Sequence, residues 1–213
     1  MNAAAESAAQ AIAFDTPRRL TPEDQVRADY YGLLAALFYG PPDARLMQGI
    51  VVSASPEGES ELACAWHALA EASAVMPQEA VAQEYEELFV GIGRPPVMLF
   101  GSYYLAGFMN ERPLAELREE LSRLGFRRAD AAHETEDHLA ALCDVMRALV
   151  TGGLADAPAA LDVQQRFFDA HMRAWVLRCC DATTTNPKAN YYQKVAAFAR
   201  AFFEIEIQAF DMP

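Results

Sequence analysis

Long apolar runs and strand-like alternation are both missing from this sequence, and their absence restricts the fold. No stretch of the 213 residues reaches the run of about 18 uncharged apolar residues that spans a bilayer. Alternating β-branched segments are also missing, which argues against an all-β architecture. Apolar residues nevertheless make up 53% of the chain, enough to bury a substantial core. The pattern predicts a single compact all-α domain of about eight to ten helices.

Positive charge is scarce as well. The chain has 17 Lys and Arg residues against 30 Asp and Glu, which gives a formal net charge of −13. Because phosphate binding needs a basic face, nucleic acid and anionic lipid are poor partners, and a basic partner is favoured. The first residues lack the basic start and apolar run of a secretory signal. We therefore expect a flexible arm over residues 1–18, one helical domain over 19–213, and a cytoplasmic protein.

Cysteine is rare, and no two cysteines form a CxxC pair. The chain has four, Cys64, Cys143, Cys179 and Cys180. The lack of such a pair favours reduced thiols that pack as small hydrophobic side chains, and a metal or redox site is the alternative.

Helix start and stop signals recur along the chain. Thr21-Pro22-Glu23-Asp24 combines an N-cap, a proline at the first helical position and an acid three residues after the cap. Gly40 ends this first helix, and Asn186-Pro187 is expected to begin the last one, after a loop over 181–185. The helices expected in between span about 43–52, 59–75, 77–89, 102–109, 113–125, 134–150 and 158–180.

The longest interruption of helical spacing lies at residues 91–96. This Gly-Ile-Gly-Arg-Pro-Pro segment has two glycines and two prolines, so it cannot form regular structure. It lacks the Lys-Ser/Thr of a phosphate loop, so it carries no nucleotide signal. Loops held by rigid helices often carry function, and we expect a cleft here.

A polar cluster at residues 134–138 is the strongest candidate for a site. Glu134, Asp137 and His138 have the spacing i, i+3, i+4, which predicts that they share one helix face. Acids at a helix start also act simply as caps, and that alternative stays open. The cluster is a weak metal site, because His133 and His138 are five residues apart and face different ways. Carboxylates that fork onto arginine, beside an imidazole, instead suit the binding of a basic peptide.

Aromatic side chains flank the 91–96 loop on both sides. Tyr85 and Phe89 are four residues apart on one expected helix, where core packing is the alternative to a binding role. Phe100 stands next to Gly101 and is the better candidate for a wall that binds apolar side chains, together with Tyr103. Ser102 has no GxSxG frame, so no catalytic residue is predicted.

Several motifs together resemble the TorD/DmsD family of redox-enzyme maturation chaperones, over about residues 25–207. In chain order they are Tyr85-x-x-Leu88-Phe89-x-Gly91, Gly101-Ser102-x-Tyr104-Leu105, Glu134-x-Glu136-Asp137-His138, Phe167-x-x-x-His171-x-x-x-Trp175 and a last helix with Tyr192. The chain differs from the family in having Leu99-Phe100 where Pro-Trp is common, which keeps an apolar wall but removes the indole N–H.

The resemblance implies a cytoplasmic helical chaperone without a chemical step or a cofactor of its own. Such proteins bind the twin-arginine signal peptide and the apo form of a molybdopterin oxidoreductase, and delay export until the cofactor is inserted. Guanine-nucleotide binding is also associated with the family, but no motif in this sequence supports it. The peptide-binding residues expected here are Tyr85, Phe89, Leu99, Phe100, Gly101, Ser102, Tyr103, Glu134, Asp137 and His138.

Two other functions stay open at the level of sequence. An assembly scaffold would dock a folded enzyme subunit and ignore its signal. A small metal-dependent hydrolase would use Glu134, Asp137 and His138, and is the weaker alternative. The oligomeric state is open between a monomer and a dimer that exchanges elements across the 181–186 loop.

Overall fold

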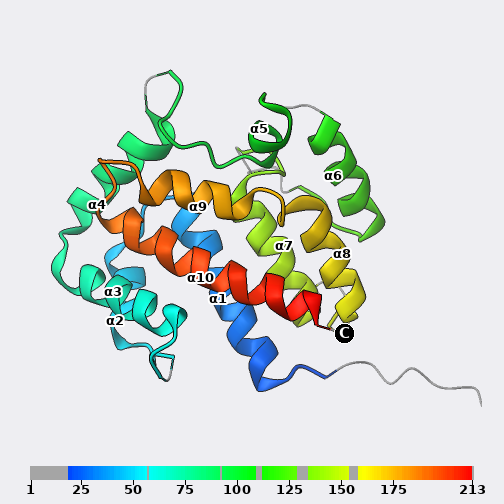
Figure 1. Ribbon diagram of the computed structural model, residues 1–213, viewed down its shortest axis with the longest axis horizontal. Coiled ribbons are helices and arrows are strands. Elements are labelled where there is room, and N and C mark those ends of the chain that lie inside the picture. Colours follow the sequence, from blue (N-terminus) through cyan, green and yellow to red (C-terminus); the bar gives the residue numbers. More distant parts are fainter. Residues whose placement is uncertain are drawn as a thin grey trace, which may run out of the picture.

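The computed structural model describes residues 19–56, 58–91, 93–108, 112–128, 134–153 and 158–212 (Figure 1). The expected N-terminal arm, residues 1–18, lies outside the described residues, and so does His133. Within the described ranges the chain forms ten α-helices and one π-helical turn, η1. In order they are α1 Pro22–Tyr39, α2 Ala44–Val52, α3 Glu61–Val75, α4 Gln78–Tyr85, η1 Glu86–Val90, α5 Gly101–Ala106, α6 Arg112–Arg123, α7 Leu139–Thr151, α8 Leu161–His171, α9 Val176–Thr184 and α10 Tyr191–Asp211.

The predicted fold class is confirmed. The described residues build a single helical domain, and their only β-type pairing is an isolated bridge between Phe100 and His138. No helix among the described residues is long and apolar enough to span a bilayer. The domain is stabilised mainly by helix faces that bury their apolar stripes against one another.

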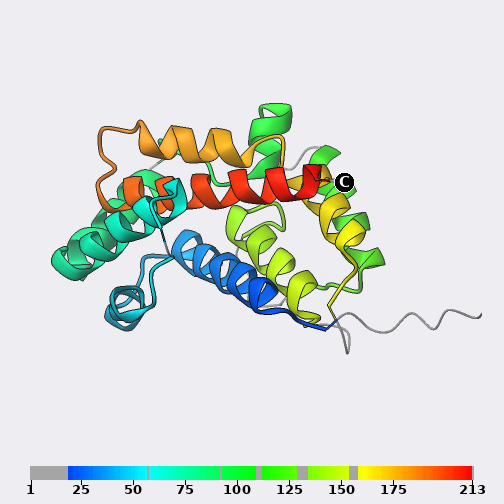
Figure 2. The ribbon, with the colours of Figure 1, turned by 60° about the horizontal axis from the view of Figure 1, so that its bottom comes forward.

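The long helices α1 and α10 organise the core. Helix α1 packs along α7, and α10 packs against both α9 and α3. Figure 2 shows the resulting arrangement, with α9 and α10 above α1 and α7 in that view. The largest fully buried side chains between them are aromatic: Trp175, Tyr31, Tyr191, Tyr192, Phe38, Phe167, Phe168, Phe198 and Phe203.

Helix α1 starts as the sequence predicts. The Thr21 side chain accepts a bond from the Asp24 backbone N–H at 3.1 Å, and the Asp24 carboxylate accepts the Thr21 backbone N–H in return. This reciprocal pair satisfies two N–H groups that the helix itself leaves without partners. One turn further on, Arg27 donates to both carboxylate oxygens of the buried Glu206 at 2.7 Å, which ties α1 to α10.

The expected helix over 134–150 is wrong at its start. Helix α7 begins at Leu139, and His138 is its N-cap, with an extended backbone at φ −65° and ψ 137°. Residues 134–137 form a turn before the helix, so Glu134, Asp137 and His138 do not share a helix face. The i, i+3, i+4 spacing misled because the same acidic residues suit a turn and a cap as well as a first helical turn.

The expected helix over 158–180 is two helices. Helix α8 ends at His171 and α9 starts at Val176, with a non-helical turn between them. Four apolar residues with helical spacing along this segment, Phe168, Met172, Trp175 and Cys179, are nevertheless buried. Periodicity alone could not detect the break, because the buried positions continue through it.

Several smaller boundaries also differ. The predicted 181–185 loop is wrong, because α9 remains helical to Thr184. The last helix starts at Tyr191 instead of after Asn186-Pro187, and Asn186 caps a short turn through its bond from the Lys188 N–H. The 77–89 helix changes from α to π geometry at Glu86. The helix expected over 102–109 ends at Ala106, and Met109 lies outside the described residues.

Candidate functional site

Two segments far apart in the sequence meet beside the 91–96 loop. We call this contact the joint and define it as residues 99–102 paired with residues 137–139. The Gly101 N–H donates to the Asp137 carbonyl at 2.9 Å, and the Leu139 N–H donates to the Leu99 carbonyl at 2.7 Å. These bonds make the bridge between Phe100 and His138. The joint therefore brings together the two motifs that the sequence singled out.

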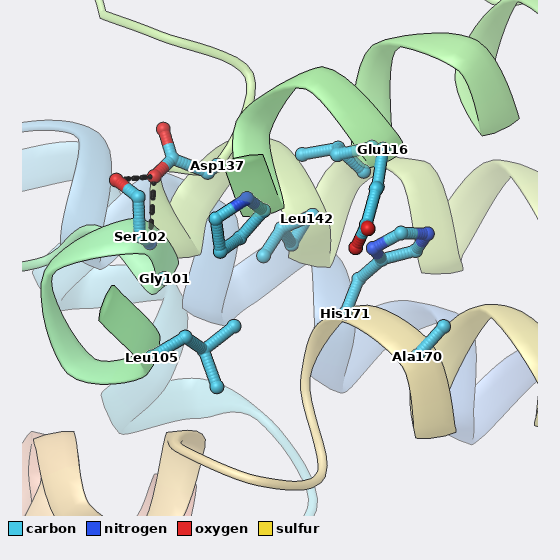
Figure 3. Close-up of a pocket in the computed structure, with 10 residues that line it drawn as sticks. Gly101, Ser102, Leu105, Glu116, Asp137, Leu142, Ala170 and His171 are labelled. Carbon is cyan, nitrogen blue, oxygen red and sulfur yellow. Dashed lines mark hydrogen bonds between the residues drawn. The ribbon is translucent and has the colours of Figure 1, made fainter. Parts of the chain in front are cut away.

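Asp137 clamps the joint through its side chain. One carboxylate oxygen accepts the Ser102 backbone N–H at 2.9 Å and the Ser102 hydroxyl at 2.5 Å (Figure 3). The other oxygen accepts the Thr135 hydroxyl at 2.6 Å. Asp137 is 4% exposed and Ser102 is 1% exposed. A buried carboxylate with both oxygens engaged holds α5 against the start of α7, which is a positioning task.

His138 also stabilises the joint, through a backbone cap and a ring contact. Its Nδ1 accepts the Ala140 backbone N–H at 3.2 Å, which caps α7, and its ring lies edge-on to Phe100 at 5.0 Å between centroids. Burial lowers the pKa of His138 from 6.5 to about 4, against the opposing effect of the Asp137 charge. The imidazole is therefore neutral near pH 7, as its acceptor role at Nδ1 requires.

Gly101 gives α5 a close approach to an indole. A Cβ atom at this position would lie 3.1 Å from the Trp175 ring, so a larger residue would push the helix away. The Trp175 indole N–H donates to the His171 carbonyl at 2.7 Å, and its ring stacks on Tyr104 at 5.4 Å. The turn between α8 and α9 thus places Trp175 directly under α5.

A small cavity of about 80 Å³ opens beside the joint (Figure 3). Its walls come from α5, α6, α7 and α8 and from the turn before α7. Leu105 stands on the rim with 42% of its surface exposed. The lining is mixed, with Gly101, Ser102, Leu105, Pro113, Glu116, Leu117, Asp137, Leu142, Ala170 and His171.

Glu116 and His171 give the cavity its polar side, and they point toward one another in Figure 3. Burial lowers the pKa of His171, while the charges of Glu120 and Glu116 act in the opposite direction. Glu116 also pairs with Arg112 at 2.7 Å in an exposed i, i+4 contact, which is a weak attachment. Its carboxylate can therefore turn to meet a cationic group in the cavity.

The predicted peptide-binding residues divide into covered and accessible groups. Tyr85, Phe89 and Leu99 are buried, at 6%, 9% and 2% exposure. Tyr85 donates its hydroxyl to the Phe38 carbonyl at 3.1 Å, and Phe89 packs edge-on to Tyr192 at 5.0 Å. These side chains form core beneath the surface, which matches the core-packing alternative for Tyr85 and Phe89.

Phe100, Tyr103 and Glu134 remain accessible. Phe100 and Tyr103 are half-buried and Glu134 is exposed. Two features near them were not anticipated from the sequence. Arg94 lies over the Tyr103 ring, and Glu116 with His171 lines the cavity. No sequence signal could pair Glu116 with His171, because they lie on different helices.

The chemistry available here is that of binding. Among the described residues, no group of three or more His, Cys, Asp or Glu side chains is arranged to hold a metal ion. The three cysteines near the core, Cys143, Cys179 and Cys180, are buried, and burial raises the pKa of each thiol. The fourth, Cys64, is exposed, unlike the expectation that all pack as small hydrophobic groups.

This chain is similar to a named chaperone and to a solved structure. It is 26% identical over 137 residues to the chaperone protein TorD of Vibrio cholerae serotype O1, in strains Ogawa 395 and M66-2, and the match covers 62% of this chain and 62% of each relative. A crystal structure from Archaeoglobus fulgidus, described as a candidate redox enzyme maturation protein, has a TM-score of 0.57 at 19% identity. It covers 84% of this chain and 94% of its own length, and it supports the fold alone.

A protein-family model gives the assignment. The model described as nitrate reductase delta subunit matches residues 55–181, a span that contains both segments of the joint, the cavity and most of helices α3 to α9. The match covers more than half of the chain and agrees with the resemblance that the motifs indicated. The chain belongs to the TorD/DmsD family.

Proposed function

We propose that this protein is a cytoplasmic chaperone that binds the twin-arginine signal peptide and the apo form of a molybdopterin oxidoreductase, and delays export until the cofactor is inserted. The similarity to the chaperone protein TorD of Vibrio cholerae supports this proposal. The observation that carries it is the cavity beside the joint, which combines apolar walls with an acidic side chain.

The apolar part of the signal docks on the rim and walls of this cavity. Leu105 is exposed there, and Pro113, Leu117 and Leu142 line the interior. Burial of apolar area contributes about 25 cal/mol per Å², so a few side chains supply several kcal/mol. Ordering a disordered signal costs a few kcal/mol. The contacts of the arginines therefore have to contribute as well to reach the micromolar affinity, about −8 kcal/mol, that we expect.

The other predicted residues beside the cavity have different tasks. Phe100, Tyr103 and Glu134 contact the peptide directly, because their side chains reach the surface. Gly101, Ser102 and Asp137 form the floor on which it lies, and His138 holds that floor in register. The formal charge of −13 draws the two arginines toward the protein over distances longer than a contact.

Calorimetric titration with a twin-arginine signal peptide tests the proposal. We expect one-to-one binding that is lost when both arginines become alanine. Leu105→Asp should weaken binding at least tenfold, about 1.4 kcal/mol, because it puts a charge on the apolar rim. Leu161→Asp is the matched control, since Leu161 is 53% exposed at the far end of α8.

Two outcomes would replace the proposal. Binding of the signal-less apoenzyme as tight as that of the full-length enzyme, with no binding of the isolated peptide, would favour the assembly scaffold. Stoichiometric zinc, iron or manganese in the purified protein would favour the hydrolase. Size-exclusion chromatography with light scattering separates the monomer from an exchanged dimer.

A further inference from the structure

An arginine of the chain itself covers the accessible face of Tyr103. The Arg94 Cζ atom lies 4.8 Å from the centroid of the Tyr103 ring, and an Arg94 guanidinium N–H donates to the Tyr103 hydroxyl. Arg94 belongs to the 91–96 loop, and Tyr103 lies in α5. Among the described residues, all the polar and ring contacts of the Arg94 side chain are to Tyr103.

The neighbouring tyrosine offers a contrast in the same helix. Tyr104 stacks on Trp175 on one side at 5.4 Å, and the Arg178 guanidinium lies over its ring at 5.4 Å. Arg178 also donates to the Tyr104 carbonyl at 3.0 Å, so both backbone and ring hold it in place. Tyr104 is therefore held by both an indole and an arginine. Tyr103 has an edge contact with Tyr104 at 5.1 Å between ring centroids, and the one cation over its ring comes from a loop.

The contact between Arg94 and Tyr103 is easy to displace. Arg94 is exposed, and an exposed cation–π contact changes an equilibrium constant by only about two- to fivefold. The loop that carries it turns at Gly91 and Gly93, both with positive φ, at 57° and 92°. Another guanidinium group with additional contacts to the protein would therefore compete successfully with Arg94.

We propose that the Tyr103 ring is a binding subsite for a guanidinium group, that Arg94 occupies it in the free protein, and that an arginine of the client signal replaces Arg94 there. This inference rests on the proposed function and names a residue that recognises the arginine pair. A planar guanidinium suits the ring face better than a lysine ammonium does. Leu105 follows in the same helix and takes the apolar residues that come after the arginines in the signal.

The proposal predicts that removing the contact between Arg94 and Tyr103 increases the affinity for the peptide. Arg94→Ala should strengthen binding of the twin-arginine peptide by about two- to fivefold, because the competing side chain is gone. Arg166→Ala removes the same charge from an exposed i, i+4 pair with Asp162 on α8, and controls for the general effect of charge. A gain as large with Arg166→Ala as with Arg94→Ala would overturn the proposal.

Substitutions that remove the Tyr103 ring should lower the affinity for the peptide, the opposite of the effect expected for Arg94→Ala. Tyr103→Leu should weaken binding by about three- to tenfold, and Tyr103→Phe should keep most of it, because phenylalanine retains the ring face. A peptide with two lysines in place of the arginines should bind the wild-type protein and the Tyr103→Leu variant with similar affinity. Unchanged binding of the twin-arginine peptide by Tyr103→Leu would overturn the proposal, provided that the wild-type protein binds this peptide.

A second measurement separates this proposal from the proposed function. Ring resonances of ¹³C-tyrosine-labelled protein, with Tyr103 identified through Tyr103→Phe, are followed during titration with arginine amide and with lysine amide. In the Arg94→Ala variant we expect the Tyr103 ring resonances to shift saturably with arginine amide and not with lysine amide. That shift without any peptide binding would support the subsite and reject the signal-binding function. Peptide binding with no shift, or equal shifts with both amides, would reject the subsite and keep the function.

Discussion

Two buried carboxylates cap helices from a distance in this protein, and their surroundings differ. Glu84 at the end of α4 accepts the backbone N–H groups of Asn190, Tyr191 and Tyr192 at 2.8, 3.0 and 2.8 Å, and so holds the start of α10. Asp137 accepts the N–H and hydroxyl of Ser102 and so holds the start of α5. Each carboxylate satisfies helix N-terminal donors that no residue of the same helix satisfies.

The difference lies in what each helix does next. Tyr191 and Tyr192 are fully buried, so the Glu84 contact secures the longest helix in the core. Helix α5 has six residues, and its Tyr103 and Leu105 reach the surface beside a cavity. The same device therefore stabilises the domain at one end and positions a short accessible helix at the other.

The largest effect should come from Glu84→Ala. It leaves buried N–H groups at the start of α10 without an acceptor, so we expect the free energy of unfolding to fall by about 3–5 kcal/mol in urea titrations. Glu87→Ala is the control, because Glu87 is exposed and its contacts are with Gln83 and Lys188 at the surface. A small effect of Glu84→Ala would break the comparison, since α10 would then not depend on its remote cap.

Asp137→Ala should cost less and act more locally. Loss of the bonds from Ser102 and Thr135 should lower the free energy of unfolding by about 2–4 kcal/mol and speed amide exchange in α5. Asp137→Asn keeps an acceptor oxygen and should lose about half as much. Unchanged stability together with lost peptide binding would instead make Asp137 a direct contact of the ligand.

Acid should weaken the joint through His138. Its pKa falls from 6.5 to about 4 on folding, so the unfolded chain binds more protons between these values. Stability contributed by the neutral ring is complete above pH 6.5 and is lost as the pH falls toward 4, by about 3 kcal/mol in total. Urea titrations of wild type and His138→Asn measure this, because asparagine keeps the N-cap acceptor but does not titrate. Parallel pH profiles for the two proteins would contradict the assignment.

The smallest expected effects on stability come from alanine substitutions at two glycines, and they have opposite signs. Gly101→Ala puts a Cβ atom 3.1 Å from the buried Trp175 ring and should lower the free energy of unfolding by about 1–3 kcal/mol. Gly49→Ala, in α2, meets no atom within 4 Å and should raise it by about 0.5–1 kcal/mol. A neutral Gly101→Ala would mean that Trp175 yields easily and that α5 is not tightly seated.

The sequence was a good guide wherever the signal was local. The capping box at Thr21 and the glycine stop at Gly40 both lie where the sequence predicts them. It was a poor guide where a distant residue decided the geometry. The start of α7 moved to Leu139 because His138 pairs with Phe100, and the 158–180 helix is broken at a turn where Trp175 packs under Gly101.

In the candidate site, too, the sequence predicted the motifs but not the contacts that depend on distant residues. The two motifs predicted to work together do meet, in the joint between residues 99–102 and 137–139. The role of each side chain could not be predicted, because burial and hydrogen-bond partners depend on the neighbouring helices. Asp137 was expected to face an incoming arginine, and in the structure both of its oxygens already have partners within the chain.

By itself, the amino-acid sequence determined the all-α class, most helix positions, the acidic charge and the pair of motifs that mark the family. These depend on periodicity, capping and composition, which act over a few residues or over the whole chain. The tertiary structure alone decided which carboxylate is buried, which aromatic ring reaches the surface and which arginine lies over that ring. Those properties arise from contacts between segments that are separated in the sequence, and no local pattern encodes them.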